Sequence, residues 1–306
     1  MEEIRVFCPA TVANVSCGFD VLGLSLASVG DEMVVRKTTR KEVVISKITG
    51  QNLPLETQKN VAGVAALALL KQIETDTGFE IEIHKKIKPG SGIGSSAASS
   101  AGAVVAINKL LNSPFSNSEL VEFAMQGEKL ASQVAHADNV APAIYGGFTL
   151  VRSYNPLDIV TIPTPADLYA TVIHPQIEIK TSDSRKILKT NISLSQGIRQ
   201  WGNLGGLIAG LFKQDYDLIG RSLEDYIVEP IRSILIPEFE ALKIEIKNAG
   251  ALGSGISGSG PSVFALSKDK KTAHQVAEAM KRVYAKTKID FDIHISPIGA
   301  SGVKAM

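Results

Sequence analysis

One stretch constrains the fold more than any other, "KPGSGIGSSAASSAGAVVAINKLL", residues 88 to 111. Its first half is rich in glycine and serine, and its second half is apolar. The segment before it, "FEIEIHKKI" at 79–87, alternates apolar and polar side chains as far as His84, which predicts a strand. The segment from Ser95 to Leu111 has the length and composition of a helix. Because both flanks are strongly patterned, the glycines are predicted to form a built turn and not a flexible linker.

A turn of this kind can hold an anion. Glycine adopts positive φ angles without strain and lets a ligand approach the backbone. The start of a helix offers unpaired N–H groups and the positive end of the helix dipole. Ser95 and Ser96 add hydroxyls where phosphate oxygens or a magnesium ion would lie. The alternative is a turn that only packs the strand against the helix.

Two common nucleotide motifs fit the loop poorly. The P-loop requires Gly-Lys followed by Ser or Thr, and no Gly-Lys pair occurs in the chain. Gly92-x-Gly94-x-x-Ala97 matches the relaxed dinucleotide fingerprint. The acidic residue that should follow about 20 residues later falls in "NSPFSNSE", which is typical of a turn and a helix cap. A nicotinamide-dependent oxidoreductase therefore stays only as an alternative.

Composition excludes several other classes. The chain carries 32 basic and 31 acidic residues, so no excess charge favours nucleic acid or an acidic membrane. Cys8 and Cys17 are the only cysteines, which excludes a disulfide scaffold and indicates a reducing compartment. Two buried thiols are expected here and not a metal site, since no histidine lies near them in the sequence. The N-terminus does not resemble a signal peptide, and the longest apolar run, at 61–70, is too short to span a bilayer. We expect a soluble cytoplasmic protein.

The pattern of elements predicts an α+β protein in two parts. In the first part, strands are predicted at 4–7, 32–37, 42–48, 79–87 and 146–153, and helices at 60–73, 95–111 and 116–132. The last of these helices opens with a capping box from Ser116 to Glu119. Three prolines within 155–167 predict a domain junction. In the second part, strands are predicted at 168–175, 262–267 and 289–296, helices at 193–213, 236–250 and 272–286, and a second glycine loop at 250–261. This order favours helices on one face of an antiparallel sheet.

Three motifs, in order, resemble those of one family, the GHMP kinases (galacto-, homoserine, mevalonate and phosphomevalonate kinases). The sequence Pro89-x-x-x-x-Gly94-Ser95-Ser96-Ala97-Ala98 is similar to their phosphate loop. "PATVANVSCGFDVLGLSL" (9–26) resembles the first family motif, and "GALGSGISGSGPSVFAL" (250–266) resembles the third. The versions found here are most similar to the homoserine kinase branch, as are "AHADNVAPAIYGG" (135–147), "TSDSR" (181–185) and "VEPIRSILIP" (228–237).

The resemblance implies both a fold and an activity. It implies a ribosomal protein S5 domain 2-like N-terminal domain at 1–165, which binds ATP, and a ferredoxin-like C-terminal domain at 166–306. The implied reaction is transfer of the γ-phosphoryl group of ATP to the hydroxyl of L-homoserine, with Mg²⁺, in threonine biosynthesis. A homodimer is the family expectation.

The resemblance also assigns the nucleotide and metal residues. ATP would lie on the loop and helix start, on Lys88, Pro89, Gly90, Ser91, Gly92, Ile93, Gly94, Ser95, Ser96, Ala97 and Ala98. Ser96 and Glu128 would hold Mg²⁺, which makes Glu128 a catalytic residue. From the residues alone, Glu128 would be a glutamate on a solvated helix face.

The same resemblance assigns the substrate residues. The substrate is a small zwitterion whose carboxylate suits the planar donors of Arg185 and Arg232. Asp20 and Asn14 would accept from its ammonium group, and His136 would contact it. The ordinary alternatives are surface arginines, turn residues and a structural histidine.

The catalytic base is the open point of the predicted mechanism. Other members of the superfamily use an aspartate before a Gly-Gly pair, and that position falls on Asn139, with Asp138 one residue away. An asparagine cannot take up a proton as a carboxylate does. Because phosphoryl transfer has a loose transition state, a strong base is less necessary. We therefore expect direct attack without a carboxylate base, with Asn14 and Asn139 orienting the hydroxyl.

Other readings remain at this point. The chain could be a GHMP kinase for another small alcohol, such as mevalonate or shikimate, because the ATP loop would be the same. It could also be a non-catalytic ATP sensor of the same fold. The second glycine loop could support the phosphate end of the site or pack the entry of a strand.

Overall fold

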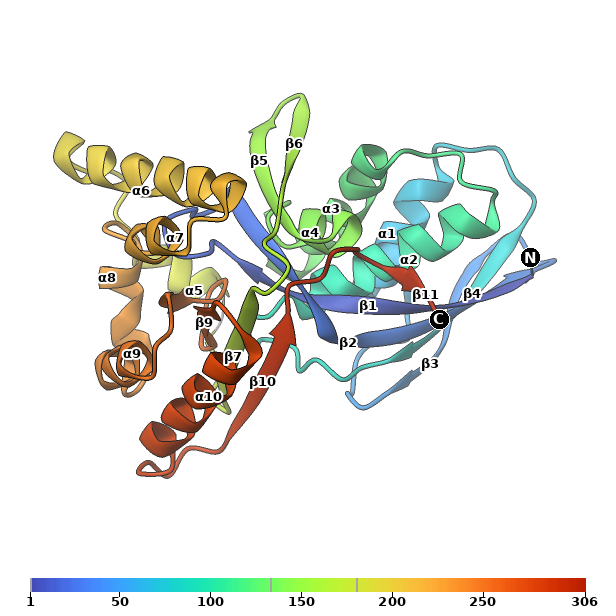
Figure 1. Ribbon diagram of the computed structural model, residues 1–306. Coiled ribbons are helices and arrows are strands. Elements are labelled where there is room, and N and C mark those ends of the chain that lie inside the picture. The colour runs from blue at the N-terminus through green and yellow to red at the C-terminus, as the bar shows by residue number, and fades with distance from the viewer. Residues whose placement is uncertain (1, 133, 180) are drawn as a thin grey trace.

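A computed structural model describes residues 2–132, 134–179 and 181–306, which form two sheets covered by helices (Figure 1). The first sheet has the strand order β11-β1-β2-β4-β3, with β5 paired to β2 and β6 paired to β5. Among the strand pairs of this sheet in the described ranges, only β3–β4 is parallel. Its strands are β1 (Glu3–Ala13), β2 (Leu22–Thr38), β3 (Val43–Thr49), β4 (Gly78–His84), β5 (Phe148–Tyr154), β6 (Leu157–Ile162) and β11 (Lys304–Ala305).

Helices cover one face of the first sheet. They are η1 (Thr57–Lys59), α1 (Val61–Leu70), α2 (Ser95–Leu110), α3 (Asn117–Ser132) and α4 (Val140–Tyr145). Helix α2 is almost wholly buried and consists largely of alanine, serine and glycine. A Cβ on Gly102 would overlap Cys8 Sγ, so small residues let α2 lie directly on β1. The predicted capping box of α3 is confirmed, since the Ser116 N–H donates to Glu119 Oε2 at 2.8 Å and the Glu119 N–H donates to Ser116 Oγ at 3.4 Å.

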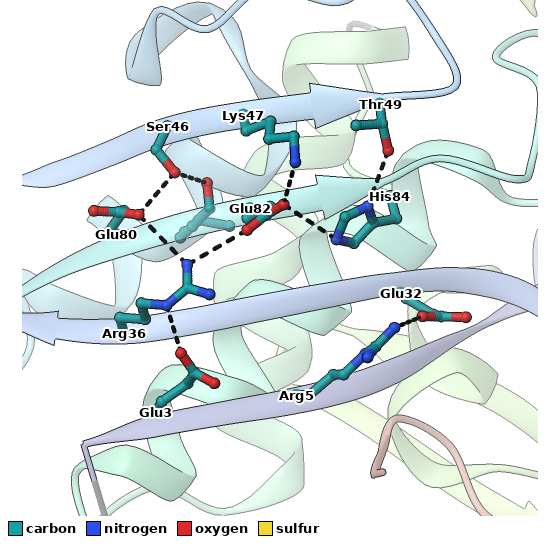
Figure 2. Close-up of polar contacts among 11 residues, drawn as sticks. Glu3, Arg5, Glu32, Arg36, Ser46, Lys47, Thr49, Glu80, Glu82 and His84 are labelled. Atoms are coloured by element: carbon teal, nitrogen blue, oxygen red, sulfur yellow. Dashed lines mark hydrogen bonds and ion pairs between the residues drawn. The ribbon is translucent and has the colours of Figure 1, made fainter.

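The opposite face of the first sheet carries charged pairs that cross the strands (Figure 2). The Arg36 guanidinium lies between Glu3, at 2.5 Å, and Glu82, at 3.4 Å. Lys47 donates to Glu82 at 2.9 Å, and Thr49 contacts His84 Nδ1 at 2.9 Å. These pairs explain the strict alternation along β4, whose apolar side chains point to the helices and whose polar ones point to water.

The second sheet has the order β10-β7-β9-β8 and is antiparallel throughout. Its strands are β7 (Tyr169–Pro175), β8 (Gly253–Ile256), β9 (Val263–Ser267) and β10 (Phe291–Pro297). The helices α9 (Phe239–Asn248) and α10 (Lys270–Tyr284) pack on one face and form a core of their own with it. The other face joins the main core through residues such as Val172 and Phe264. Strand, helices, two strands, helix and strand follow each other as in a ferredoxin-like domain, so this prediction is confirmed.

Four further α-helices of the described part of the chain lie between β7 and α9. They are α5 (Thr181–Lys186), α6 (Leu194–Lys213), α7 (Tyr216–Ser222) and α8 (Glu229–Arg232), and the 3-10 helix η2 (Ser233–Leu235) follows them. Figure 1 shows α6 on the outside of the molecule, with α7 beside it. None of the helices in the described ranges is long and apolar enough to cross a membrane.

Several boundaries differ from the predictions, most of all that of β2, which was predicted at 32–37 and begins at Leu22. Strand β1 was predicted at 4–7 but continues to Ala13, and Pro9 sits at an irregularity in its register with β2. The proline-rich segment 155–167 is more than a junction, since β6 within it forms a hairpin with β5. The second glycine loop likewise contains β8, whose small residues pair with β9.

The end of the chain returns to the first sheet. Strand β11 pairs with β1, with Ala305 opposite Val6. Just before it, the Val303 N–H donates to the Ala143 carbonyl at 2.8 Å, and the Gly147 N–H donates to the Gly299 carbonyl. The last residues therefore brace α4 and the start of β5. The division into domains at 1–165 and 166–306 stays a prediction. Residues 304–305, which the prediction assigns to the second domain, pair with a strand of the first.

Candidate active site

A cavity of about 480 Å³ collects residues from every motif singled out in the sequence. It lies where the first motif, the phosphate loop, the segment before α4 and the arginine segments meet. The predicted residues that line it are Asn14, Asp20, Pro89, Gly90, Gly92, Gly94, Ser95, Ser96, Glu128, His136, Asn139, Arg185 and Arg232. A larger groove of about 1380 Å³ beside α1 and α3 contains none of the predicted site residues.

The phosphate loop ends in a left-handed residue directly before α2. Gly94 has φ +68° and precedes the first helical residue. A Cβ at this position would overlap Thr11 Oγ1 and lie 3.0 Å from Asn139 Oδ1. The Thr11 hydroxyl donates to that same Asn139 oxygen at 2.7 Å. Glycine at 94 is therefore required both by the backbone and by the side chains around the loop.

The second glycine loop holds the first one in place. Ser257 Oγ donates to the Gly92 carbonyl at 2.7 Å, and Ser262 Oγ donates to the Ser91 carbonyl at 2.6 Å. A Cβ on Gly92 would come within 2.7 Å of the carbonyl oxygens of Ser257 and Gly260. The second glycine loop therefore packs against the phosphate loop, which is one of the two roles considered for it from the sequence.

Sequence reasoning missed a lysine beneath the loop. Lys85 is buried, forms an ion pair with Asp31, and donates to the Ser95 carbonyl at 2.9 Å and to Ser99 Oγ at 3.1 Å. Asp31 also accepts the backbone N–H groups of the two residues after Lys85, at 2.7 and 2.9 Å. These bonds join the two ends of the phosphate loop. The end of the alternating pattern at His84 was the only sequence signal for an inward-facing Lys85.

Ser96 and Glu128 lie together at the start of α2. The Ser96 side chain hydrogen-bonds to the Glu128 carboxyl group, and both residues line the cavity. Burial raises the pKa of Glu128 to about 7, against the opposing effects of Ser96 and Lys85. A hydroxyl and a carboxylate at a helix start are hard oxygen donors, and they fit Mg²⁺ that is shared with phosphates. Within the described ranges, no three His, Cys, Asp or Glu residues are placed to hold a metal by themselves.

The first motif is a left-handed turn closed by Asn14. Asn14 has φ +70° and Asp20 has φ +61°. The Asn14 amide donates to the Gly258 carbonyl at 2.8 Å, and its oxygen accepts the Asp20 N–H at 3.0 Å. Both ends of this amide therefore bind backbone, which ties the first motif to the second glycine loop. The expected contact of Asn14 with the substrate stays a prediction.

Asp20, Arg185 and His136 form a polar cluster on one side of the cavity. Arg185 Nη2 lies 2.7 and 2.8 Å from the two carboxylate oxygens of Asp20, and 3.0 Å from His136 Nε2. His136 Nδ1 is 3.7 Å from Asp20. Burial lowers the pKa of His136, and the nearby Asp20 opposes that effect. The His136 ring thus lies between the carboxylate of Asp20 and the guanidinium group of Arg185.

Arg232 is the buried member of the predicted arginine pair. Its Nε donates to the Ser184 carbonyl at 3.1 Å, and its Nη1 donates to the Gly258 carbonyl at 3.1 Å. Both guanidinium groups lie over the Phe19 ring, Arg185 at 5.5 Å and Arg232 at 5.1 Å from its centre. Burial and the charge of Arg185 lower the pKa of Arg232 to about 10. An anion between the two arginines would relieve this repulsion.

The segment before α4 brings Asp138 and Asn139 to the cavity. Asp138 is buried, and its Oδ1 has no hydrogen-bond partner in the described part of the chain. Burial, with Asp20 and Glu128 nearby, raises the pKa of Asp138 to about 7. Tyr154, which the sequence did not reveal, supports this segment. Its hydroxyl donates to the Asp20 carbonyl at 3.1 Å and accepts the Ala137 N–H at 3.3 Å.

Five residues of the predicted ATP set lie outside the cavity lining, namely Lys88, Ser91, Ile93, Ala97 and Ala98. The last four are buried and pack the loop and helix. The Lys88 ammonium donates to Gln176 Oε1 at 2.6 Å. The Gln176 amide in turn donates to His174 Nδ1 at 3.2 Å and to Asp292 at 2.7 Å. The base of the loop is therefore tied to β7 and β10.

Comparisons with known proteins place these features in a family. The model for the N-terminal domain of GHMP kinases matches residues 60–147, and the model for their C-terminal domain matches residues 207–286. Homoserine kinase of Chloroherpeton thalassium is 46% identical over 319 residues, which cover all of both chains. The enzyme of Chlorobaculum tepidum is 45% identical over 99% of this chain and 98% of its own.

Solved structures agree with these matches. A crystal structure of homoserine kinase from Cytophaga hutchinsonii superimposes with a TM-score of 0.96 and 51% identity, and covers 100% of this chain and 98% of its own. A mevalonate kinase of L. major in complex with R-mevalonate has a TM-score of 0.71 at 17% identity, covering 97% of both chains. The latter likeness concerns the fold alone.

Proposed function

Since this chain belongs to the GHMP kinase family, with full-length relatives among the homoserine kinases, we propose that it transfers the γ-phosphoryl group of ATP to the hydroxyl of L-homoserine. One observation carries the proposal. A single cavity holds the glycine loop and helix start on one side and two arginines with an aspartate on the other. This combination suits a phosphate donor facing a small zwitterion.

The nucleotide is assigned to the loop and the first turn of α2. Backbone N–H groups at the helix start and the helix dipole face the phosphates. The loop keeps its shape because Ser257 and Ser262 hold its carbonyls and Lys85 joins its ends. The ammonium group of Lys85 binds Asp31, Ser95 and Ser99 within the protein. Backbone N–H groups would therefore bind the phosphates that a lysine binds in P-loop proteins.

Ser96 and Glu128 are the residues that would hold Mg²⁺. The ion neutralises charge on the phosphates when it is bound. Ser96 places its hydroxyl at the helix start, and Glu128 offers a buried carboxylate that hydrogen-bonds to it. A cation at this position favours the charged form of Glu128, against the effect of burial.

The polar cluster is suited to an amino acid. Asp20 and Arg185 form an ion pair with each other. A bound zwitterion can replace this pair with two new ones, its ammonium group with Asp20 and its carboxylate with Arg185, so that no charge is left unpaired. The substrate ammonium would bind Asp20, and its carboxylate would bind Arg185 and Arg232. Mevalonate and shikimate lack the ammonium group, which argues for an amino acid over these rival alcohols.

This scheme assigns no carboxylate base to the proton of the attacking hydroxyl. Asn139 faces the cavity with its Oδ1 fixed by Thr11, so its amide N–H₂ group can donate to the hydroxyl oxygen. Asp138 is not the general base in this scheme. An Asp138→Asn variant that folds and binds homoserine normally is expected to keep turnover within about tenfold, whereas general bases typically contribute 10²–10⁴-fold. A fall in turnover of 10²–10⁴-fold, with homoserine binding intact, would instead identify Asp138 as the base.

An ADP-release assay with Mg-ATP tests the function directly. L-Homoserine is compared with L-serine, L-threonine, mevalonate and shikimate, and absorbance of reduced nicotinamide serves as the control for a dehydrogenase. Strong selectivity for L-homoserine is expected. Turnover of another alcohol would keep the ATP site and reject the substrate assignment, and ATP binding without turnover of any of them would indicate a sensor. A cytoplasmic role in threonine biosynthesis, as a homodimer, completes the proposal.

A further inference from the structure

Both arginines of the site share one aromatic ring, that of Phe19. This side chain is half-buried and lines the cavity. The guanidinium carbons of Arg185 and Arg232 lie 5.5 and 5.1 Å from the centre of the ring, within the range in which the negative face of a ring attracts a cation. Among the cation–π contacts of the described residues, no other ring has two cations. Phe19 is therefore placed to act on the two arginines together.

The two guanidinium groups repel each other. After burial, the charge of Arg185 is the largest effect that lowers the pKa of Arg232 to about 10. Arg232 is fixed by the carbonyls of Ser184 and Gly258, whereas the Arg185 side chain is 36% exposed, so repulsion would displace Arg185 first. A ring that attracts both cations offsets part of this repulsion and keeps the two groups close to each other.

The remaining donors of this pair are suited to a carboxylate. Arg185 Nε is buried and has no hydrogen-bond partner in the described part of the chain. Arg232 Nε and Nη1 donate to backbone carbonyls, which fixes the plane of the guanidinium group, and its Nη2 forms no hydrogen bond within the described ranges. A carboxylate has two oxygens, so it can accept from both arginines when they are held at one spacing.

Phe19 follows a turn with a strained backbone. Asn14, Val15 and Ser16 have φ angles of +70°, +40° and +61°. A positive φ is uncommon for any residue with a side chain and is an outlier for a β-branched one such as Val15. The turn is closed by the Gly18 N–H, which donates to the Asn14 carbonyl at 2.9 Å. Such residues persist where the surrounding structure determines them, and they gather at ligand sites. The turn therefore sets where Phe19 lies.

A hydrogen-bond network joins this turn to the helix that carries Arg232. The Gln200 amide donates to the Cys17 carbonyl and to Asp225 Oδ1, both at 3.0 Å. The Asp225 carboxylate accepts three N–H groups at the start of α8 and just before it, at 2.9 to 3.0 Å. Helix α8 ends at Arg232. The position of Phe19 is thus coupled to that of Arg232 through the chain as well as through the ring contact.

We propose that Phe19 is a positioning residue that determines specificity, because its ring holds Arg185 and Arg232 at the spacing at which they bind one carboxylate. The inference rests on the proposed function and deepens it, since the carboxylate is that of the amino-acid substrate. It assigns the preference for an alcohol with a carboxylate in part to an apolar residue. An aliphatic side chain of similar size fills the same space but attracts neither guanidinium group.

Two alcohols that differ only in the carboxylate test this role. L-Homoserine is compared with 3-aminopropan-1-ol, which keeps the hydroxyl and the ammonium group. The ratio of their kcat/KM values measures selection for the carboxylate, and loss of folded protein cancels in this ratio. In Phe19→Leu the ratio is expected to fall about tenfold, because two cation–π contacts are lost together. Phe19→Tyr keeps a ring and should keep the ratio.

Two further variants control for folding and packing. Phe19→Met removes the ring with a second aliphatic side chain, so the result does not depend on the folding of one variant. Phe123→Leu is the matched control, since Phe123 lines the larger groove beside α1 and α3 and its ring centre lies 5.1 Å from that of Phe115. It should leave the ratio unchanged. The KM for ATP should not change in any of these variants.

The possible failures are distinguishable. An unchanged ratio in Phe19→Leu and Phe19→Met, with homoserine still phosphorylated, would reject the role of Phe19 and leave the proposed function intact. An equal fall of the ratio in Phe123→Leu would assign the effect to general packing and reject the inference. A parent protein that does not phosphorylate homoserine would reject the proposed function, and the role of Phe19 with it.

Discussion

Alanine substitution at two glycines of the phosphate loop separates backbone strain from side-chain contact. Gly90 and Gly94 both have positive φ angles, +75° and +68°. A Cβ on Gly90 has no atom within 4 Å, whereas a Cβ on Gly94 would overlap Thr11 Oγ1 and lie 3.0 Å from Asn139 Oδ1. Gly90→Ala therefore measures the cost of the left-handed backbone alone, and Gly94→Ala measures that cost together with the collision.

The magnitudes follow from these environments. A left-handed alanine costs about 1–2 kcal/mol, and the lower entropy of its unfolded chain returns about 0.4–1 kcal/mol. Gly90→Ala is thus expected to lower the free energy of unfolding by at most about 1.5 kcal/mol. Gly94→Ala must also displace the Thr11 hydroxyl and break its 2.7 Å bond to Asn139, which costs a further 1–3 kcal/mol or so. The total for Gly94→Ala is roughly 2–4 kcal/mol.

Thermal unfolding and steady-state kinetics report the two effects separately. At about 2–4 °C per kcal/mol for a large domain, Gly94→Ala should melt roughly 4–16 °C below the parent protein. Its kcat should fall as well, because Asn139 moves with Thr11. The Gly90→Ala variant should melt within a few degrees of the parent and keep its kcat. Equal melting temperatures and equal kcat values for the two variants would refute the reasoning, since the shared φ would then be the whole effect.

Three further changes have defined outcomes. Lys85→Met leaves Asp31 buried without its ion-pair partner and should cost about 3–5 kcal/mol in urea unfolding, more than Lys85→Arg, and a loss below 1 kcal/mol would show that the pair is dispensable. Tyr154→Phe removes both hydroxyl bonds and should raise KM for the alcohol more than KM for ATP, so equal rises would contradict a role in the polar cluster. Burial, together with the nearby Lys88 charge, lowers the pKa of His174 to about 4, against about 6.5 in an unfolded chain, so its stabilising effect is complete above pH 6.5 and is lost as the pH falls toward 4. The melting temperature should therefore drop more between pH 7 and pH 5 for the parent protein than for His174→Gln, and parallel drops would assign the effect to other groups.

The motifs predicted the cavity better than they predicted its supports. Glycine, serine and arginine at fixed spacings are tied to local chemistry, so the residues that face the cavity could be read from short segments. Lys85 and Tyr154 act through partners far away in sequence, Asp31 and Asp20. No local pattern reveals such a pairing, because the fold has to bring the partners together first.

Element boundaries failed where local rules compete with the sheet. Strands were predicted at 4–7 and 32–37, yet β1 continues through Pro9 and β2 begins well before Gly30. A Cβ on Gly30 would overlap the Cys8 carbonyl, so glycine there permits close contact between β1 and β2. The ladder of hydrogen bonds on both sides outweighs the weak propensity of single residues. Pairing partners, and not propensity, set the length of these strands.

The return of the chain end to β1 has a consequence for biosynthesis. Proteins fold from the N-terminus as the ribosome releases them, but here the first sheet gains its last strand only when residues 304–305 emerge. Until then, the edge of β1 at Val6 and Phe7 is open to other strands, and α4 lacks the hydrogen bond from Val303 to Ala143. Products of premature termination would expose this edge for as long as they persist. Residues 304–305 are therefore needed to finish a sheet whose other strands are made earlier.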